Sequence, residues 1–587
     1  MSNAFRKRSL GRTYGAVVLV LVMCVLTACA QIPTESAVSS RDVSVQDPAP
    51  IFLQADGPQR DATPQEIVDG FVSAQAAGIA DSWAVAKEFL TSTAAAKWDP
   101  ASSTSIYTGE LVLQTLDNLQ EDSAENLDLA EALSVSVQGT AKSVGIVATN
   151  GSYSESVPDA KYDLTFDLVK NSDGQWRISS LQDGVLISKP NFQTQYRAAS
   201  VYFLSPQGDY LVPEVRWVAL AKLETYVVNA LLGGPSPWLQ DAVVTAIPEG
   251  TRLMYDSVPS ESGTAVVNLS SEVQKATPRD RELLATQIQE TLTKLPGIRD
   301  VRFQVNSVDI QVVPDANVVR DPILANDPVV LSNDELFQVK GRTLVALDAR
   351  GSLAPYSVSA LATEDRSAQG VFLDGADTIR RIPDADGEAA VLFKGRTLIP
   401  PSLDRFGWAW TGEKVQPDDR DGKLSAVSSD ATAVPVKVPW LTGRLVRAAR
   451  VSHDGARVVV LSSSNGVTRI DVAGVLRDEN GVPQSLSDPI SVGAQVQDAE
   501  LVQWLDESTL GVIGKTSGSD IEIFASVPLS GSSEAVATAE DVNALAIGRG
   551  LRSVFIGTAD NTVLGRGSIG SAWVEIADDA RLPTFPG

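Results

Sequence analysis

The sequence predicts a multidomain protein in which two α+β domains precede an all-β propeller. Helical apolar periods with capping residues recur between about residues 63 and 300, interspersed with alternating strand patterns. From about residue 325 the helical periods vanish, and short apolar strands recur between Gly, Asp, Ser and Asn turns. Helices followed by antiparallel strands indicate α+β domains, whereas strands repeated at the spacing of a propeller blade indicate a propeller.

The composition is that of a folded and strongly acidic protein. The 587 residues, 43% of them hydrophobic, are enough for about three or four domains. The formal net charge of −25 argues against binding nucleic acid or anionic lipid through a broad positive field. The charge fits a soluble body that stands off an anionic membrane surface, and solubility alone is an equally good reason for it.

The first 28 residues have the three-part layout of a secretory signal. Basic Arg6, Lys7 and Arg8 precede an almost wholly apolar stretch over residues 15–26. This stretch is shorter than the roughly 20 residues that a membrane span needs. An uncleaved anchor helix is the alternative interpretation. Either way, we expect the rest of the chain to lie outside the cytoplasm, at a membrane surface.

The segment Leu26-Thr27-Ala28-Cys29 resembles a bacterial lipobox. The resemblance implies cleavage between Ala28 and Cys29, which would make Cys29 an N-palmitoyl, S-diacylglycerol cysteine. The alternative is an ordinary signal with a chance cysteine. Cys24 would leave with the signal, so the mature chain would have no thiol for a disulfide. We therefore expect a lipid-anchored protein on the extracytoplasmic side of the cell membrane.

Residues 29–62 are predicted to be a linker, and residues 63–190 an α+β domain. Thr63-Pro64-Gln65-Glu66 combines a capping residue, a first-turn proline and the Glu of a capping box. A second helix is expected from about Asp81, followed by antiparallel strands such as the alternating run 162–168. This order resembles the cone-shaped, NTF2-like domains of exported bacterial proteins, which serve as spacers, docking pieces or small-ligand binders.

Residues 191–320 are predicted to be a second α+β domain. A hairpin over 201–215 precedes a helix that we expect to include Trp217, Leu220 and Leu223 and to end at Gly233-Gly234-Pro235. A strand at 265–269, a helix capped by Thr277 and a strand at 301–305 follow. The short blocks resemble the GerMN domain of spore-germination and envelope lipoproteins, which implies binding rather than catalysis. The matching blocks are 202–204, 211–213, 230–235, 247–251, 267–270 and 295–297.

Residues 321–587 are predicted to form the propeller. Three segments superpose without gaps, each reading as strand, polar turn and strand, and they begin at Val451, Trp504 and Ile547. A looser copy spans 403–410, and Lys-Gly-Arg-Thr-Leu occurs at 340–344 and 394–398. The distances in sequence between the starts of these segments match the length of a four-stranded blade, so about six blades fit the region. A pair of β-sandwiches is the competing fold.

The sequence offers little catalytic equipment, and we predict no catalytic, cofactor-binding or metal-binding residues. His453 is the single histidine, and it lies in a predicted turn without a neighbouring nucleophile motif. The acidic segments 384–387 and 418–422 resemble parts of calcium loops, but the later Glu of an EF-hand is not at the right spacing, so turns are the better interpretation. A glycosidase with paired carboxylates remains open, because 73 acidic residues offer many pairs.

Three aromatic residues of the propeller are candidates for surface anchors. Tyr356, Trp410 and Trp440 stand in the strand-rich region, and aromatic side chains dominate the energetics of interfaces. Positions in the core are the alternative for all three.

The order of signal, linker, cone-like domain, GerMN-like domain and propeller resembles the LpqB lipoproteins of actinobacteria. The resemblance covers nearly the whole chain, including the closing segment 582–587. It implies an accessory of the MtrA–MtrB two-component system that contacts the extracytoplasmic sensor region of the MtrB histidine kinase. Signalling linked to envelope homeostasis and cell division would be tuned in this way. The alternative is a protein that binds or processes cell-wall glycan.

Overall fold

The computed structural model describes residues 55–586 except 80–81, 117–130, 323–326, 365–368, 386, 415–422 and 568–571. The predicted signal, the lipidation site with Ala28 and Cys29, and the first part of the predicted linker lie outside these residues. The chain divides into two units, Met1–Pro48 and Ala49–Gly587, and the second contains every element described below. Among the described residues no helix has the length and apolar character needed to cross a membrane.

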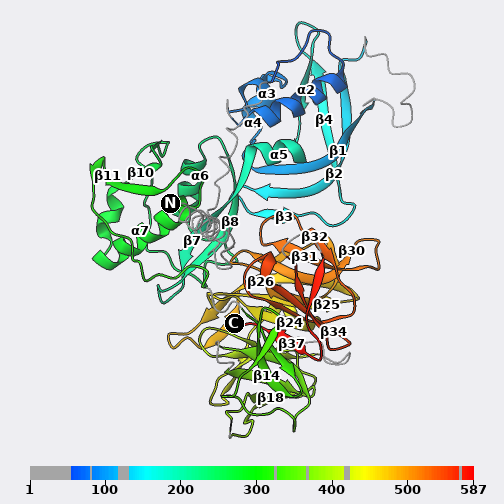
Figure 1. Cartoon of the computed structure of the whole chain (residues 1–587). Helices are drawn as coiled ribbons and strands as arrows, with labels where there is room; N and C mark the ends of the chain where they lie inside the picture. Colours follow the sequence, from blue (N-terminus) through cyan, green and yellow to red (C-terminus); the bar gives the residue numbers. More distant parts are fainter. Residues whose placement is uncertain are drawn as a thin grey trace, which may run out of the picture. The chain divides into compact units, whose positions relative to one another are not determined.

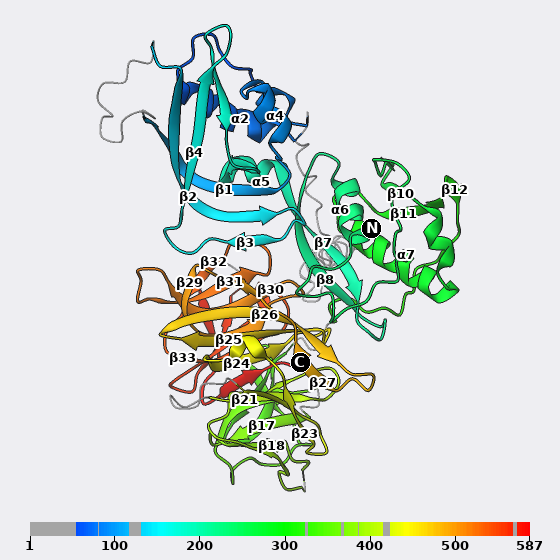
Figure 2. The same cartoon turned by 180° about the vertical axis from the view of Figure 1, so that it is seen from behind.

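The first domain packs short helices against a six-stranded sheet of order β5-β4-β2-β1-β6, with β3 paired to β2. The pairs are antiparallel except β1 with β6. Figure 2 shows α2 and α4 together on one side of the strands. The helices are α2 Pro64–Ala77, α3 Ala84–Glu88, α4 Ser92–Lys97 and α5 Lys189–Gln195. The strands are β1 Ser103–Leu116, β2 Ser134–Ala148, β3 Tyr153–Glu155, β4 Lys161–Lys170, β5 Trp176–Ser180 and β6 Val185–Ser188.

The capping box predicted at Thr63 is confirmed. Its side chain accepts from the Glu66 backbone N–H, and the Glu66 carboxylate accepts from the Thr63 N–H. Phe71 on the buried face of α2 meets Trp98 and Phe166 edge-on, at ring distances of 5.3 and 6.3 Å. The second helix begins later than its expected start near Asp81, because Trp83 adopts a left-handed conformation (φ 58°) and α3 begins after it.

The second domain contains the hairpin β7–β8 and a four-stranded sheet of order β12-β11-β10-β9. Strands β10 and β11 are parallel, and α7 makes the crossover between them (Figure 1). The cap predicted at Thr277 is confirmed, and the structure adds a capping box in which the Asp280 carboxylate accepts from the Thr277 N–H. The elements are β7 Tyr196–Leu204, β8 Leu211–Ala219, α6 Leu223–Leu232, β9 Ser260–Glu261, β10 Thr264–Leu269, η1 Ser271–Lys275, α7 Pro278–Leu292, β11 Asp300–Val305 and β12 Val308–Asp309.

The predicted start of the helix before Gly233 was wrong. Trp217 belongs to β8 and pairs with Ala198 of β7, and Leu220 lies in the following turn. Helix α6 begins at Leu223, after Lys222 in a left-handed conformation (φ 67°). The apolar spacing of 217, 220 and 223 suits a helix, but pairing with β7 takes the first of these residues into a strand.

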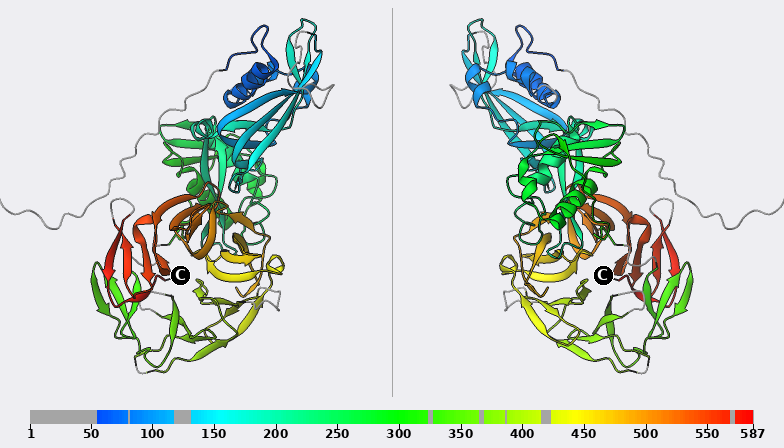
Figure 3. Two further views of the ribbon diagram at one scale, coloured as in Figure 1. Left: turned by 90° about the vertical axis from the view of Figure 1, so that its right-hand side faces the viewer. Right: turned by 90° about the vertical axis from the view of Figure 1, so that its left-hand side faces the viewer.

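The remaining strands form six sheets, the blades of a propeller, which Figure 3 shows arranged in a ring. The first three blades contain β13 Val329–Ser332, β14 Glu335–Lys340, β15 Thr343–Ala346; β16 Val358–Thr363, β17 Gly370–Asp374, β18 Thr378–Arg381, β19 Val391–Lys394; and β20 Ser402–Leu403, β21 Ala409–Glu413, β22 Lys423–Val427, β23 Ala433–Val436. The other three contain β24 Leu445–Val451, β25 Arg457–Ser464, β26 Val467–Arg477, β27 Pro483–Leu486, β28 Ile490–Val492; β29 Val496–Trp504, β30 Thr509–Thr516, β31 Glu522–Pro528, β32 Glu534–Thr538; and β33 Val542–Ile547, β34 Val554–Thr558, β35 Val563–Arg566, β36 Trp573–Ala577. Two short 3₁₀ helices, η2 Pro439–Leu441 and η3 Leu551–Ser553, accompany them.

The ring is closed by β37, Arg581–Thr584, which pairs with β13 and completes the first blade from the far end of the chain. The three superposed repeats each begin at the end of an inner strand (β24, β29 or β33) and continue into the second strand of the same blade. The looser copy at 403–410 occupies the same place in the third blade. The propeller is therefore confirmed, and the alternative of two sandwiches is excluded.

The pentapeptide Lys-Gly-Arg-Thr-Leu does not mark equivalent blade positions. Its first copy connects β14 to β15 within the first blade. Its second copy begins at the end of β19, the last strand of the second blade, and leads toward the third blade. A turn-forming pentapeptide can serve either connection, because only its local backbone geometry is encoded.

Candidate functional site

The aromatic residues proposed as anchors lie in or against the core. The Trp410 side chain is fully buried, with 0% exposure. Tyr356 packs against Phe372, with ring centroids 5.4 Å apart, and its hydroxyl accepts from the Ala389 backbone N–H. Trp440 is half-buried, and its indole donates to the Ser487 carbonyl. None of these three residues forms a large exposed anchor.

The single histidine lies in a buried turn rather than in a catalytic arrangement. Burial lowers the pKa of His453, which favours its neutral form. Within the described residues, no group of His, Cys, Asp and Glu side chains has the arrangement to hold a metal ion. In the candidate calcium segment 384–387, the Asp384 carbonyl accepts from the Gly387 N–H as in a turn. Asp386 and the segment 418–422 lie outside the described residues.

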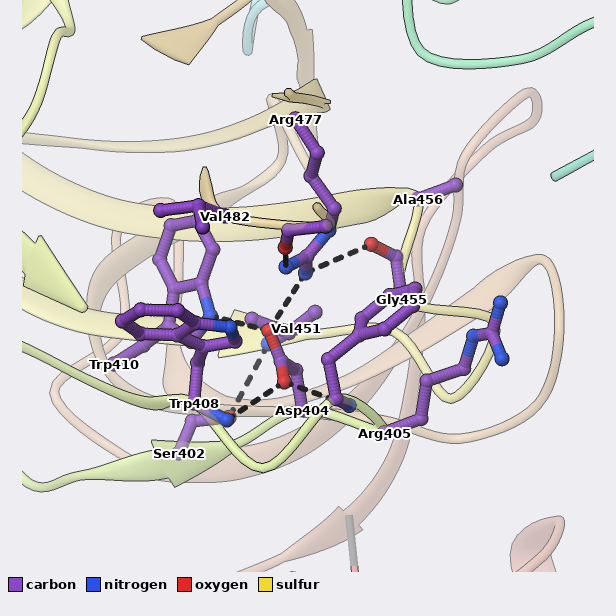
Figure 4. Close-up of polar contacts among 12 residues, drawn as sticks. Ser402, Asp404, Arg405, Trp408, Trp410, Val451, Gly455, Ala456, Arg477 and Val482 are labelled. Atoms are coloured by element: carbon purple, nitrogen blue, oxygen red, sulfur yellow. Dashed lines mark hydrogen bonds and ion pairs between the residues drawn. The ribbon is translucent and has the colours of Figure 1, made fainter. Parts of the chain in front are cut away.

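A buried carboxylate organises the turn between β20 and β21 (Figure 4). Asp404 is 3% exposed and accepts hydrogen bonds from the backbone N–H groups of Phe406 and Trp408 and from the Trp410 indole, each at 2.9 Å. The two backbone groups share Oδ1, whereas Oδ2 accepts from the Trp410 indole and, at 2.6 Å, from the Arg477 guanidinium of the neighbouring blade. Every acceptor direction of this carboxylate is thus used, and the ion pair joins the third blade to the fourth.

The next residue along the chain, Arg405, reaches into the second domain. Its Nη1 and Nη2 donate to the two oxygens of Asp209, at 2.9 and 2.8 Å. Asp209 lies in the β7–β8 turn, and the guanidinium also stacks over the Tyr210 ring at 4.1 Å. Burial alone would raise the pKa of Asp209, but the hydrogen bonds from Arg405 and Ser205 lower it overall. A two-point pair of this kind fixes orientation as well as contact.

A second contact between the same domains surrounds Arg457 in the fourth blade. This fully buried guanidinium pairs with Asp454 in the same turn and donates to the Glu507 carbonyl at 2.8 Å. The Glu507 carboxylate accepts from the Tyr202 hydroxyl of β7 at 2.6 Å. Burial raises the pKa of Glu507, although the hydrogen bond from Tyr202 opposes this.

The loop 530–533 of the fifth blade contacts both α+β domains. The Ser530 hydroxyl accepts from the Tyr153 N–H at 3.2 Å, and the Ser530 carbonyl accepts from the Trp217 indole at 3.0 Å. The Glu155 carboxylate accepts from both the backbone N–H and the hydroxyl of Ser533, each at 2.7 Å. The loop thus ties the first domain, the second domain and the propeller together at one place.

Sequence reasoning missed all of these contacts. Asp404-Arg405 and Asp454 with Arg457 are visible as charged residues in predicted turns, but their partners Asp209 and Glu507 lie far away in the chain. The one usable signal was an Arg one or three residues after an Asp in two successive repeats of the otherwise apolar blades. Such charges are rarely buried unless they are paired.

Two large cavities lie in the second domain and in the propeller. One, of about 560 Å³, is lined in the second domain by apolar residues including Val273, Val305 and Val312. The other, of about 440 Å³, lies between the second and third blades and is lined by both arginines and carboxylates, among them Arg381 and Glu388. Both have the size of small-ligand sites.

Three family models match successive parts of the chain. The N-terminal domain of lipoprotein LpqB matches residues 57–193, the Germane domain of sporulation and spore germination matches 200–311, and the LpqB β-propeller domain matches 334–586. The solved first GerMN domain of the sporulation protein GerM from Bacillus subtilis is 23% identical. It covers 21% of this chain and 96% of its own, with a TM-score of 0.17.

Curated relatives match over most of the chain. Lipoprotein LpqB of Bifidobacterium longum is 26% identical over 539 residues, covering 90% of this chain and 88% of its own. Lipoprotein LpqB of Thermobifida fusca is 24% identical over 646 residues, covering 98% and 99%. The domain order, the family models and these relatives agree. The chain belongs to the LpqB family of lipoproteins.

Proposed function

We propose that this lipoprotein is anchored through Cys29 on the extracytoplasmic side of the cell membrane and binds the sensor region of an MtrB-type histidine kinase. Its binding would modulate the MtrA–MtrB two-component system and thereby envelope homeostasis and cell division. The observation that carries the proposal is membership of the LpqB family over almost the whole chain. A lipobox-like segment at 26–29 supports the anchor.

The contacts between the domains support a role in docking. Arg405 with Asp209, Tyr202 with Glu507, and the loop 530–533 hold three domains in contact through specific hydrogen bonds. Three domains held together by these contacts keep their surfaces in fixed positions relative to one another. This rigidity lowers the entropic cost of binding a large partner. This role needs no catalytic residue.

The proposed mechanism has two parts. Attachment of Cys29 to the bilayer confines the protein to the membrane of the kinase and raises its effective concentration without a new contact. A preference for one conformation of the kinase then shifts the population toward that conformation. The shift between the two conformations of the kinase is limited by the difference between the affinities of the lipoprotein for them.

The test uses the full-length chain in cells, because truncation near residue 320 would break the contacts between the second domain and the propeller. A photo-crosslinking amino acid is placed at one exposed valine in each domain: Val112, Val313 or Val467, which are 63%, 78% and 62% exposed. We expect a crosslink to the kinase from one domain and none from the other two. Absence of kinase from all three positions, with the anchor intact, contradicts the proposed partnership.

The anchor is tested separately with Cys29→Ser. This variant should fold normally, pass from the detergent phase into the aqueous phase, and lose its effect on the kinase. A signal-peptide variant that keeps the cysteine, Leu26→Ile, is the matched control. Unchanged signalling by a released Cys29→Ser protein would contradict the mechanism by confinement.

Binding of envelope glycan is the second candidate, and the cavity of about 440 Å³ between two blades favours it. Carboxylates and arginines on its wall suit a polar, partly charged sugar. Calorimetric titration of the purified chain with cell-wall fragments tests this function. Turnover of the fragments that is lost in Glu388→Gln would indicate a glycan-processing enzyme. Binding of the fragments without turnover would indicate a glycan carrier. The absence of any heat of binding would reject both functions.

A further inference from the structure

A small cavity of about 30 Å³ lies where the innermost strands of all six blades meet. Residues of β16, β20, β24, β29, β33 and β37 line it, which identifies it as the central channel of the propeller. A cavity needs about 10–15 Å³ of such volume to hold one water molecule. The space therefore accommodates about two water-sized groups.

The wall of this cavity carries one side chain that is charged at neutral pH. Arg450 of β24 lines it, and no Asp or Glu is among the lining residues. His453 also lines it, but burial lowers its pKa and favours the neutral ring. Burial lowers the pKa of Arg450 to about 10, so its guanidinium is still protonated near pH 7.

One edge of this guanidinium is held by the protein and the other is not. Nη1 donates to the carbonyls of Pro400 and Ala449, both at 2.9 Å. Nε is buried and lacks a hydrogen-bond partner. Over the part of the chain that the structure describes, Nη2 makes no hydrogen bond either, although it is not one of the fully buried atoms. Nε and Nη2 together form the side of a guanidinium that binds two oxygens of a planar anion.

A cation deep in a protein without a counter-charge is costly, and an unmade hydrogen bond of a charged group adds to that cost. Among the arginines of the propeller, Arg477 and Arg457 each have a carboxylate partner in direct contact. Arg450 has no carboxylate partner among the described residues, and it lines the central channel. Ser402 stands on the same wall, and its oxygen accepts from the Val451 N–H. Among the described residues its hydroxyl hydrogen has no acceptor, so it can donate to a ligand.

We propose that the central channel binds a small free carboxylate, with both of its oxygens on Nε and Nη2 of Arg450. Two parallel hydrogen bonds satisfy the open edge of the guanidinium and neutralise its charge. The volume restricts the ligand to about the size of formate, since a longer chain would not fit between the six inner strands. Such binding is distinct from the proposed contact with a kinase and does not depend on it.

Formate is the probe, and the full chain without its signal is the protein. Urea unfolding is followed at constant ionic strength while formate replaces fluoride, so that screening of the strongly acidic surface does not change. At a formate concentration ten times Kd, the ratio of folded to unfolded wild-type protein should rise about 11-fold. Transfer of saturation from the protein to the formate proton provides a second signal that requires no unfolding.

Arg450→Met should abolish both signals, and Arg450→Lys, which keeps the charge but loses the fork, should weaken them. Arg447→Met is the matched control, because Arg447 lies on the same strand but donates to Ser463 and does not line the cavity. If Arg450→Met fails to fold, the saturation signal in wild type and in Arg450→Lys still decides. The proposal is overturned if formate stabilises wild type no more than Arg450→Lys, or if the saturation signal persists in Arg450→Met.

Discussion

Breaking the ion pair between Asp404 and Arg477 should destabilise the propeller more than any exposed pair does. The two side chains are 0% and 4% exposed. Arg477→Met removes the guanidinium and leaves the Asp404 carboxylate charged and buried, still accepting three N–H groups. Removing one partner of a buried pair typically costs about 3–5 kcal/mol. The retained N–H donors place the expected cost near the lower end, about 3 kcal/mol.

Asp404→Asn should cost a similar amount, because it leaves Arg477 without its counter-charge. The double variant leaves no buried charge, so its loss should fall short of the sum of the single losses by about 2 kcal/mol. Urea unfolding followed by tryptophan fluorescence measures all four proteins, with Trp410 next to the substitution. Lys515→Met is the control, since its pair with Asp498 is 37% and 59% exposed and should change stability by less than about 1 kcal/mol. Additive losses would refute the idea that the two charges compensate one another.

Three further predictions concern the junction, a turn and the closing strand. Because burial raises the pKa of Glu507, its contribution to stability is present below the ordinary value of 4.5 and is lost as the pH rises through the raised value. Wild type should therefore gain stability relative to Glu507→Gln when the pH is lowered from 7. Unfolding experiments at several pH values measure this, and parallel profiles of the two proteins would contradict it. Gly455→Ala should destabilise the protein by about 1–2 kcal/mol more than Gly466→Ala. Both glycines have a positive φ, but of the two only a methyl group at 455 would meet a ring carbon of Phe406, at 2.9 Å. Equal unfolding midpoints of the two variants would show that the Phe406 ring moves aside. Deletion of β37 should leave the first blade open to limited proteolysis, and protection equal to that of wild type would mean that the ring closes without it.

Local signals account for the parts of the fold that could be predicted. The capping boxes at Thr63 and Thr277 involve residues three positions apart, so sequence alone contains both partners. The repeats beginning at Val451, Trp504 and Ile547 carry their own turns and strands, and the ring follows from their number and spacing. These features depend on short-range chemistry, which a single sequence displays completely.

The contacts between domains could not be predicted, because their partners are brought together only by the folded chain. Arg405 and Asp209 are 196 residues apart, and nothing in either turn specifies the other. Trp217 illustrates a different failure, since its apolar neighbours suit a helix or a strand and the pairing with β7 decides. Arg450 looks like any polar residue at the end of a strand, and only the ring of blades places it at the centre of a channel.

The closing strand has a consequence for how the protein acquires its structure. Leu331 and Arg581 are neighbours in one sheet although roughly 250 residues separate them, and contacts of such long range form late and slowly. Until β37 arrives, β13 presents an unpaired edge, which is a template for pairing with another chain. A newly made molecule thus passes through an interval in which a second copy can supply the missing strand. Dilution or assisted folding should favour the monomer over such a strand-exchanged pair.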